Sequence, residues 1–64
     1  MEYLLKIADY NWKPGSQTEM IYEDAKGEYF IGPPKNIFIG NTYTVEIGDK
    51  PTEEKYYRII KFIA

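Results

Sequence analysis

The sequence predicts a small all-β domain in which five strands close into a barrel. Turn-forming Gly, Pro, Asn and Asp residues recur roughly every eight to twelve positions, a spacing typical of β-sandwiches and barrels. The segments between them are rich in aromatic and β-branched residues, which favour strands. The 64 residues, which we treat as one domain, include neither Cys nor His, so packing must supply the stability that disulfides or zinc give many domains of this size.

The first predicted strand covers residues 2–10. Tyr3, Leu5 and Ile7 alternate along it and are expected to share one face. Residues 11–16 are expected to form a loop. Within that loop Pro14-Gly15 favours a type II turn, because the third position of such a turn needs a positive φ that glycine adopts without strain.

Residues 18–23 and 28–31 are expected to pair as a hairpin. The connecting turn is residues 24–27, with Gly27 in the left-handed conformation. Tyr22 and Tyr29 are candidates for a stabilising cross-strand pair on this hairpin. Two consecutive prolines in residues 32–36 then end it, because proline cannot donate a hydrogen bond to a neighbouring strand.

A short apolar stretch, residues 37–39, and a Gly-Asn turn precede the most regular strand of the chain. In residues 42–47 the side chains of Tyr43, Val45 and Ile47 alternate with polar ones. We therefore expect these three side chains to face the core, with Val45 at its centre.

The last segment, residues 53–63, fits two structures. As a helix it has Thr52 as N-cap and an apolar stripe at helical spacing, which gives a ββββα arrangement. As a strand it is dense in aromatic and β-branched residues. We favour the strand, which completes the barrel.

The strand 2–10, the hairpin 18–31, the segment Ile-Gly-Asn-Thr-Tyr-Thr-Val-Glu-Ile at 39–47 and the closing strand 56–63 together resemble an OB-fold. This resemblance covers nearly the whole chain as a pattern and includes no diagnostic motif. It implies a five-stranded Greek-key barrel of a kind that often binds nucleic acids. Many OB-folds have a helix between strands three and four, whereas the interval here is short and rich in Pro and Gly. An SH3-like barrel is therefore an alternative.

The composition argues against an enzyme. The sequence has no His to titrate near neutral pH and no Cys nucleophile, and Ser16 is its only serine. The neighbouring acids Glu23 and Asp24, and Glu53 and Glu54, are expected to be solvated surface. We expect no catalytic residue, no metal site and no cofactor.

Net charge and hydropathy exclude only some classes of binding partner. Eight basic and ten acidic residues leave a net charge of −2, without the clear basic excess usual in a duplex-DNA binder. The N-terminus lacks the basic and apolar regions of a signal peptide, and no apolar run approaches the ~18 residues of a membrane span. We expect a cytoplasmic protein without a membrane partner.

Our first functional hypothesis is binding of single-stranded nucleic acid. Such modules stack bases on exposed rings and use basic groups for the phosphates. The candidate rings are Tyr10, Trp12, Tyr22 and Tyr29, and the candidate phosphate ligands are Lys6, Lys13 and Arg58. Four other rings, those of Tyr3, Phe38, Tyr43 and Phe62, are assigned to the core.

The alternative hypothesis is a protein-binding module, such as a phage-encoded inhibitor or accessory factor of a host complex. Its contacts would be Trp and Tyr hot spots, or an unpaired strand edge that also suits a homodimer. The two hypotheses differ in one arrangement. Nucleic-acid binding requires Lys6, Lys13, Arg58 and Lys61 to share a face with exposed rings.

Overall fold

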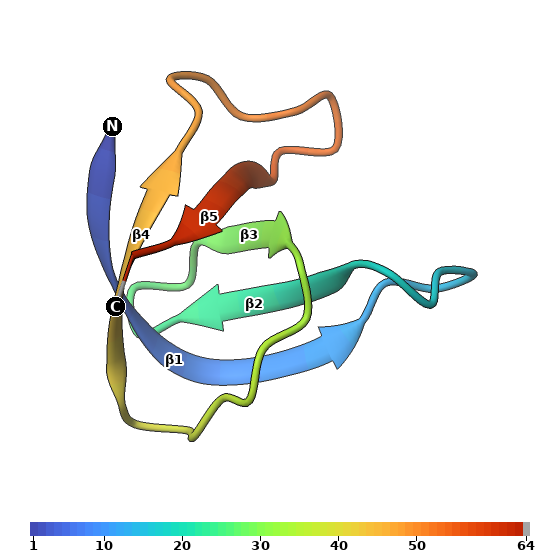
Figure 1. The fold of residues 1–64 in the computed structure, drawn as a ribbon. Coiled ribbons are helices and arrows are strands. Elements are labelled where there is room, and N and C mark those ends of the chain that lie inside the picture. The colour runs from blue at the N-terminus through green and yellow to red at the C-terminus, as the bar shows by residue number, and fades with distance from the viewer. Residues whose placement is uncertain (64) are drawn as a thin grey trace.

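A computed structural model describes residues 1–63 and shows a closed barrel of five strands (Figure 1). The strands are β1 (Glu2–Trp12), β2 (Met20–Asp24), β3 (Tyr29–Gly32), β4 (Thr42–Ile47) and β5 (Tyr57–Phe62). The all-β prediction is confirmed, and the segment that fitted either a helix or a strand contains β5. Residues 1–63 include no helix long and apolar enough to cross a membrane.

The strands follow a Greek-key path. β1, β2 and β3 are neighbours in sequence order, and β4 then returns to lie beside β1. β5 closes the barrel between β4 and β3, antiparallel to the first and parallel to the second. The long β1 serves two partners: residues 2–6 pair with β4, and residues 7–12 pair with β2. An irregularity between Ile7 and Asp9 marks the change of partner, as β-bulges commonly do where a strand bends.

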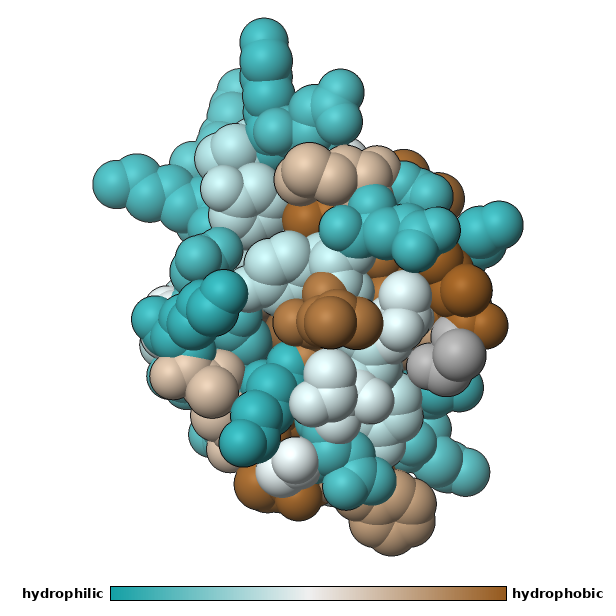
Figure 2. Space-filling view, turned by 90° about the vertical axis from the view of Figure 1, so that its left-hand side faces the viewer, coloured by the Kyte–Doolittle hydropathy of each residue, from teal (hydrophilic) through white to brown (hydrophobic). Residues whose placement is uncertain are grey.

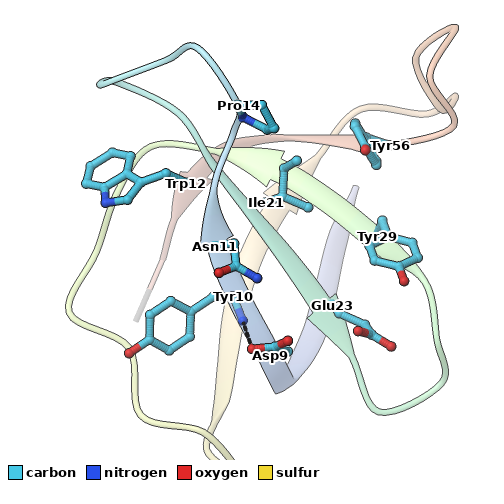
Figure 3. Close-up of a pocket in the computed structure, with 9 residues that line it drawn as sticks. All are labelled: Asp9, Tyr10, Asn11, Trp12, Pro14, Ile21, Glu23, Tyr29 and Tyr56. Carbon is cyan, nitrogen blue, oxygen red and sulfur yellow. Dashed lines mark hydrogen bonds between the residues drawn. The ribbon is translucent and has the colours of Figure 1, made fainter.

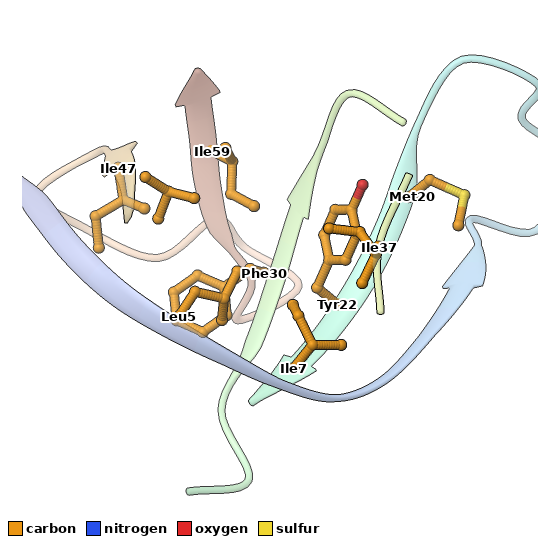
Figure 4. Close-up of a cluster of buried hydrophobic side chains, with 9 residues drawn as sticks. Leu5, Ile7, Met20, Tyr22, Phe30, Ile37, Ile47 and Ile59 are labelled. Atoms are coloured by element: carbon orange, nitrogen blue, oxygen red, sulfur yellow. The ribbon is translucent and has the colours of Figure 1, made fainter. Parts of the chain in front are cut away.

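Alternate side chains from every strand fill the barrel (Figure 4). The predicted inward face of β4 is confirmed, since Val45 and Ile47 are buried and Tyr43 packs against the cluster. Tyr3 and Phe62 also pack against it, as predicted. The buried cluster consists of Leu5, Ile7, Met20, Tyr22, Phe30, Ile37, Val45, Ile47 and Ile59.

Phe38 is an exception to the predicted core. It is 68% exposed, whereas its neighbour Ile37 is buried. The two residues lie in the connection between β3 and β4, in which Ile37 is the one buried residue. The connection therefore has room for one of them inside the barrel, and the smaller residue is the one that is buried. The assignment of Phe38 to the core was wrong.

The turn between β2 and β3 is shifted by one residue from the predicted one. The Asp24 N–H donates to the Glu28 carbonyl at 2.9 Å, so Asp24 and not Glu23 lies opposite Glu28 at the turn, and Gly27 has φ 83° as expected. Tyr22 consequently lies opposite Phe30, and Tyr29 lies opposite Glu23. Because the side-chain period of a strand is two, Tyr22 and Tyr29 point to opposite faces of the hairpin. The predicted Tyr22–Tyr29 pair was wrong.

The side chain of Asp24 organises this turn. One carboxylate oxygen accepts hydrogen bonds from the N–H groups of Lys26 and Glu28, at 2.8 and 3.1 Å, and the other accepts one from the Tyr3 hydroxyl at 2.6 Å. Burial alone raises the pKa of Asp24, but these hydrogen bonds outweigh it and hold the pKa below its ordinary value. The expectation that Asp24 is solvated surface was wrong, because the folded turn buries it.

Gly32 lets β3 and β5 approach closely. A Cβ atom at this position would lie only 2.6 Å from the Cβ of Ile59. The ladder between these strands is short, with Phe30 opposite Tyr57 and Ile31 opposite Arg58. Closure of the barrel at this seam thus depends on a residue without a side chain.

Candidate binding surface

Two exposed aromatic side chains mark the C-terminal half of β1. Trp12 was expected in a loop, but it is the last residue of β1 and is 53% exposed. Tyr10 precedes it by two positions and is also exposed, and both rings project toward the same side of the strand (Figure 3). Two rings held by one strand form a more rigid contact surface than two rings on a loop.

A hollow of about 460 Å³ lies beside these rings, on the outer face of β1, β2 and β3 (Figure 3). The strand register determines which side chains lie side by side at the bottom of the hollow. Asn11 lies opposite Ile21, and Asp9 lies opposite Glu23, which in turn lies opposite Tyr29. We call this the first hollow. Its lining residues are Asp9, Tyr10, Asn11, Trp12, Pro14, Ile21, Glu23, Tyr29 and Tyr56.

The β1–β2 loop forms one rim of the first hollow. The Ser16 N–H donates to the Lys13 carbonyl at 3.0 Å and Gly15 has φ 79°, so the predicted Pro-Gly turn is confirmed. The Ser16 hydroxyl accepts hydrogen bonds from the N–H groups of Thr18 and Glu19. These bonds hold Pro14 at the edge of the hollow.

Tyr56, from the β4–β5 loop, forms another part of the rim. The Thr52 hydroxyl accepts a hydrogen bond from the Tyr56 N–H at 3.2 Å, so Thr52 caps a single turn instead of the helix considered from the sequence. Lys55 completes that turn with φ 68°, a conformation that residues other than glycine seldom adopt. The Tyr56 ring then meets the Tyr29 ring edge to face, with the centroids 6.1 Å apart.

Two ion pairs connect the loops and strands around this rim. The Lys13 ammonium lies 3.9 Å from a Glu54 carboxylate oxygen, and the Arg58 guanidinium contacts the Glu19 carboxylate. The hydrogen bond from Arg58 lowers the pKa of Glu19. Two of the three predicted phosphate ligands therefore already have carboxylate partners.

The other predicted residues lie elsewhere. Lys6 is on the half of β1 that pairs with β4. Lys61 is on β5, opposite Glu46 of β4. Figure 2 shows the side of the barrel with β4 and the N-terminus, where hydrophilic atoms predominate and hydrophobic ones form small, separate patches. Neither Lys6 nor Lys61 lines a hollow that contains the exposed rings.

Tyr22 is fully buried. Its hydroxyl donates to the Pro33 carbonyl at 2.7 Å, and burial raises the pKa of Tyr22 to about 12. A ring inside the barrel cannot stack on a ligand. Tyr29, by contrast, is 44% exposed and belongs to the first hollow.

A second hollow adjoins the first, between the C-terminal half of β1 and the β3–β4 connection. It shares Tyr10 and Trp12 with the first hollow and adds the exposed side chains of Pro34, Lys35 and Phe38. Its lining residues are Tyr10, Trp12, Met20, Pro34, Lys35, Asn36, Ile37 and Phe38. The two hollows together form a continuous surface with Tyr10 and Trp12 at its centre.

Several residues of this surface were not singled out from the sequence. Tyr56 was hidden in the segment that fitted both a helix and a strand, and Phe38 was placed in the core. Asp9 gave no signal, because a single acid at a strand end is ordinary surface. The alternation of Ile21 with Tyr22 would have placed one of the two outside, once the hairpin register was known.

Charge separates the two hollows. The first contains the carboxylates of Asp9 and Glu23, and no Lys or Arg of residues 1–63 lines it. The second contains Lys35, whose ammonium lies 5.5 Å from the centroid of the Phe62 ring.

No protein-family model matches the chain, and neither the curated proteins nor the solved structures that were searched gave a match.

Proposed function

We propose that this chain is a non-catalytic module that binds a segment of another protein across the surface formed by the two hollows. The observation that carries the proposal is the position of Tyr10 and Trp12, two exposed rings that belong to both hollows. Tyr and Trp are enriched among the residues that dominate binding energy at protein interfaces. Rings fixed on a strand contribute large contact area with little loss of side-chain entropy.

We further infer that the barrel is OB-fold-like and not SH3-like. The support is the Greek-key order of its five closed strands. OB-folds commonly bind their ligands on the face of strands two and three, between the loops that follow strands one and four. The first hollow lies on that face, and Pro14 and Tyr56 come from those two loops.

Electrostatics favour a protein ligand over a nucleic acid at the first hollow. A phosphate backbone needs basic partners, whereas this hollow has two carboxylates. Lys13 and Arg58, which lie nearby, are paired with Glu54 and Glu19. A nucleic-acid strand here would have to break those pairs and approach two like charges.

Single-stranded nucleic acid is the second candidate, and the second hollow supports it. Lys35 lies there with Tyr10, Trp12 and Phe38, which joins one basic group to three rings. Stacked bases contribute about 1–3 kcal/mol each. A short strand across this hollow alone would avoid Asp9 and Glu23.

The experiment is a selection of short peptides by display against the immobilised protein, repeated with Trp12→Ala. We expect enriched peptide families that bind the wild type and lose binding to Trp12→Ala. Leu4→Ala is the matched control, because Leu4 is an exposed apolar residue on the half of β1 that pairs with β4. No enrichment, or enrichment that Trp12→Ala leaves unchanged, would overturn the proposal.

The nucleic-acid candidate is tested by titrating the protein with a mixed-sequence oligonucleotide at ~50 mM salt while the fluorescence of Trp12 is followed. We expect no change. A response whose log affinity falls with log salt by roughly 0.7 per phosphate contact would favour the second candidate instead.

A further inference from the structure

We propose that the first hollow is a receptor for an arginine side chain of the bound segment, with an apolar residue of the same segment in the second hollow. The inference deepens the proposed function and rests on it. Three features of the first hollow support it: two carboxylates without a basic partner, an aromatic pair beside them, and the apolar surface that continues past Trp12.

Asp9 and Glu23 have no basic partner among residues 1–63, and both line the first hollow. The Asp9 carboxylate accepts one hydrogen bond, from the Tyr10 N–H at 2.8 Å (Figure 3). Asp9 and Glu23 are direct partners in the β1–β2 ladder, an arrangement in which like charges destabilise a sheet. A cation placed beside Asp9 and Glu23 lowers the repulsion between their negative charges. This gain in electrostatic energy favours a cationic ligand at this point of the hollow.

An aromatic pair lies beside these carboxylates. Tyr29 lies opposite Glu23, and its ring is braced by that of Tyr56. Tyr10 follows Asp9 in β1, and its ring projects with that of Trp12 toward the second hollow (Figure 3). A guanidinium group stacks on such rings through cation–π contact and presents a planar fork of N–H donors to carboxylates. Arginine therefore uses both kinds of group, whereas lysine provides a point charge without the stacking plane.

The neighbouring residues of the ligand are expected to be apolar. Trp12 separates the first hollow from the second, where Pro34, Ile37 and Phe38 provide an apolar surface. A segment that places arginine beside the carboxylates continues across Trp12 onto this surface. The preferred ligand thus combines one arginine with an adjacent proline, aliphatic or aromatic residue.

The first test is the composition of the peptides enriched in the display selection. We expect their families to share an arginine flanked by an apolar residue. Families without a basic residue that still require Trp12 would overturn this inference and leave the proposed function standing. The absence of any enriched family would overturn both.

The second test uses the best arginine peptide and the same peptide with citrulline, its neutral analogue, at that position. We expect citrulline to weaken binding to the wild type about tenfold. Glu23→Gln and Asp9→Asn should each weaken the arginine peptide and leave the citrulline peptide unchanged. Asp49→Asn is the matched control, since it removes the same charge from an exposed residue outside the hollow. Equal binding of both peptides, or equal effects of Glu23→Gln and Asp49→Asn, would overturn the inference.

The third test needs no ligand. Because Asp9 and Glu23 repel each other in the free protein, Glu23→Gln should raise the melting temperature at low salt, and the gain should shrink as salt screens the repulsion. A melting temperature that falls at low salt would show that Glu23 already has a favourable partner, and would remove the basis for a cation beside the carboxylates.

Discussion

Tyr22 and Tyr29 lie on the same hairpin, yet the structure uses them in opposite ways. Tyr22 is completely buried and donates its hydroxyl proton to the Pro33 carbonyl, whereas Tyr29 is 44% exposed at the first hollow. The difference comes from the turn, which places Asp24 opposite Glu28 and so shifts the register by one residue. The hairpin thus separates two tasks by face: its inner side chains stabilise the barrel, and its outer ones are available to a ligand.

Tyr22→Ala should have the largest effect on stability. Removing a large buried aromatic side chain costs about 3–5 kcal/mol, which is on the order of the whole stability of a domain of this size. We expect the variant to be unfolded at room temperature by near-UV circular dichroism. Tyr22→Phe, which removes only one hydrogen bond, should lose about 1 kcal/mol and keep a cooperative melt. If Tyr22→Ala melts like the wild type, the inner and outer faces have been assigned the wrong way round.

Asp24→Ala should have the next largest effect. It leaves the N–H groups of Lys26 and Glu28 and the Tyr3 hydroxyl without their acceptor, at a cost of about 2–3 kcal/mol. We expect a lower urea midpoint at pH 6. Because this turn sets the register, the variant should also perturb the amide resonances of both Tyr22 and Tyr29.

The same carboxylate predicts a pH dependence. The folded-state pKa of Asp24 is lowered, so its ionised form stabilises the fold at any pH above the ordinary value of about 3.9. That contribution is lost as the pH falls below this value and through the folded pKa. We expect the urea midpoint of the wild type to drop more between pH 6 and pH 3 than that of Asp24→Ala. Equal drops would assign the acid sensitivity to other carboxylates.

Tyr29→Ala should affect binding more than stability, the opposite of what we expect for Tyr22→Ala. The fold loses only an edge-to-face contact with Tyr56, which contributes about 1 kcal/mol. Binding of the selected peptides should weaken strongly, because the ring is part of the first hollow. Urea melts and peptide titrations on the same preparation check both expectations. A variant that is unstable but binds normally would refute the division of the hairpin into two faces.

Lys13→Ala should have the smallest effect. Exposed ion pairs such as Lys13–Glu54 contribute about 0–1 kcal/mol, so the melting temperature should hardly change. The arginine peptide should bind equally well or slightly better, since a nearby positive charge is removed. A marked loss of oligonucleotide binding would instead identify Lys13 as a phosphate ligand.

Much of the fold follows from the sequence, because alternation and turn residues act locally. Residues 42–47 alternate cleanly, and β4 has those bounds. The sequence did not reveal where β1 ends, since Trp12 continues the strand through pairing with Met20, a contact distant in sequence. It also did not show that Ile37 fills the core in place of Phe38, which depends on how the β3–β4 connection crosses the barrel.

The candidate site was predictable only in part, for the same reason. Tyr10, Trp12 and Tyr29 were identified because aromatic residues near turns stand out. Asp9, Glu23 and Tyr56 join them through strand register and a loop turn, neither of which has a local signature. Lys13 and Arg58 were candidates for phosphate contacts, and only the folded structure shows their pairing with Glu54 and Glu19.

Gly32 has a consequence for how this protein behaves at high concentration. A methyl group at that position would collide with Ile59, so β5 would have to move away from β3 and their short ladder would be weakened. Free edges recruit strands from neighbouring molecules, which is a common route to aggregates and domain-swapped oligomers. The missing side chain at Gly32 therefore keeps the edges of β3 and β5 paired with each other, where they are not available to strands of neighbouring molecules.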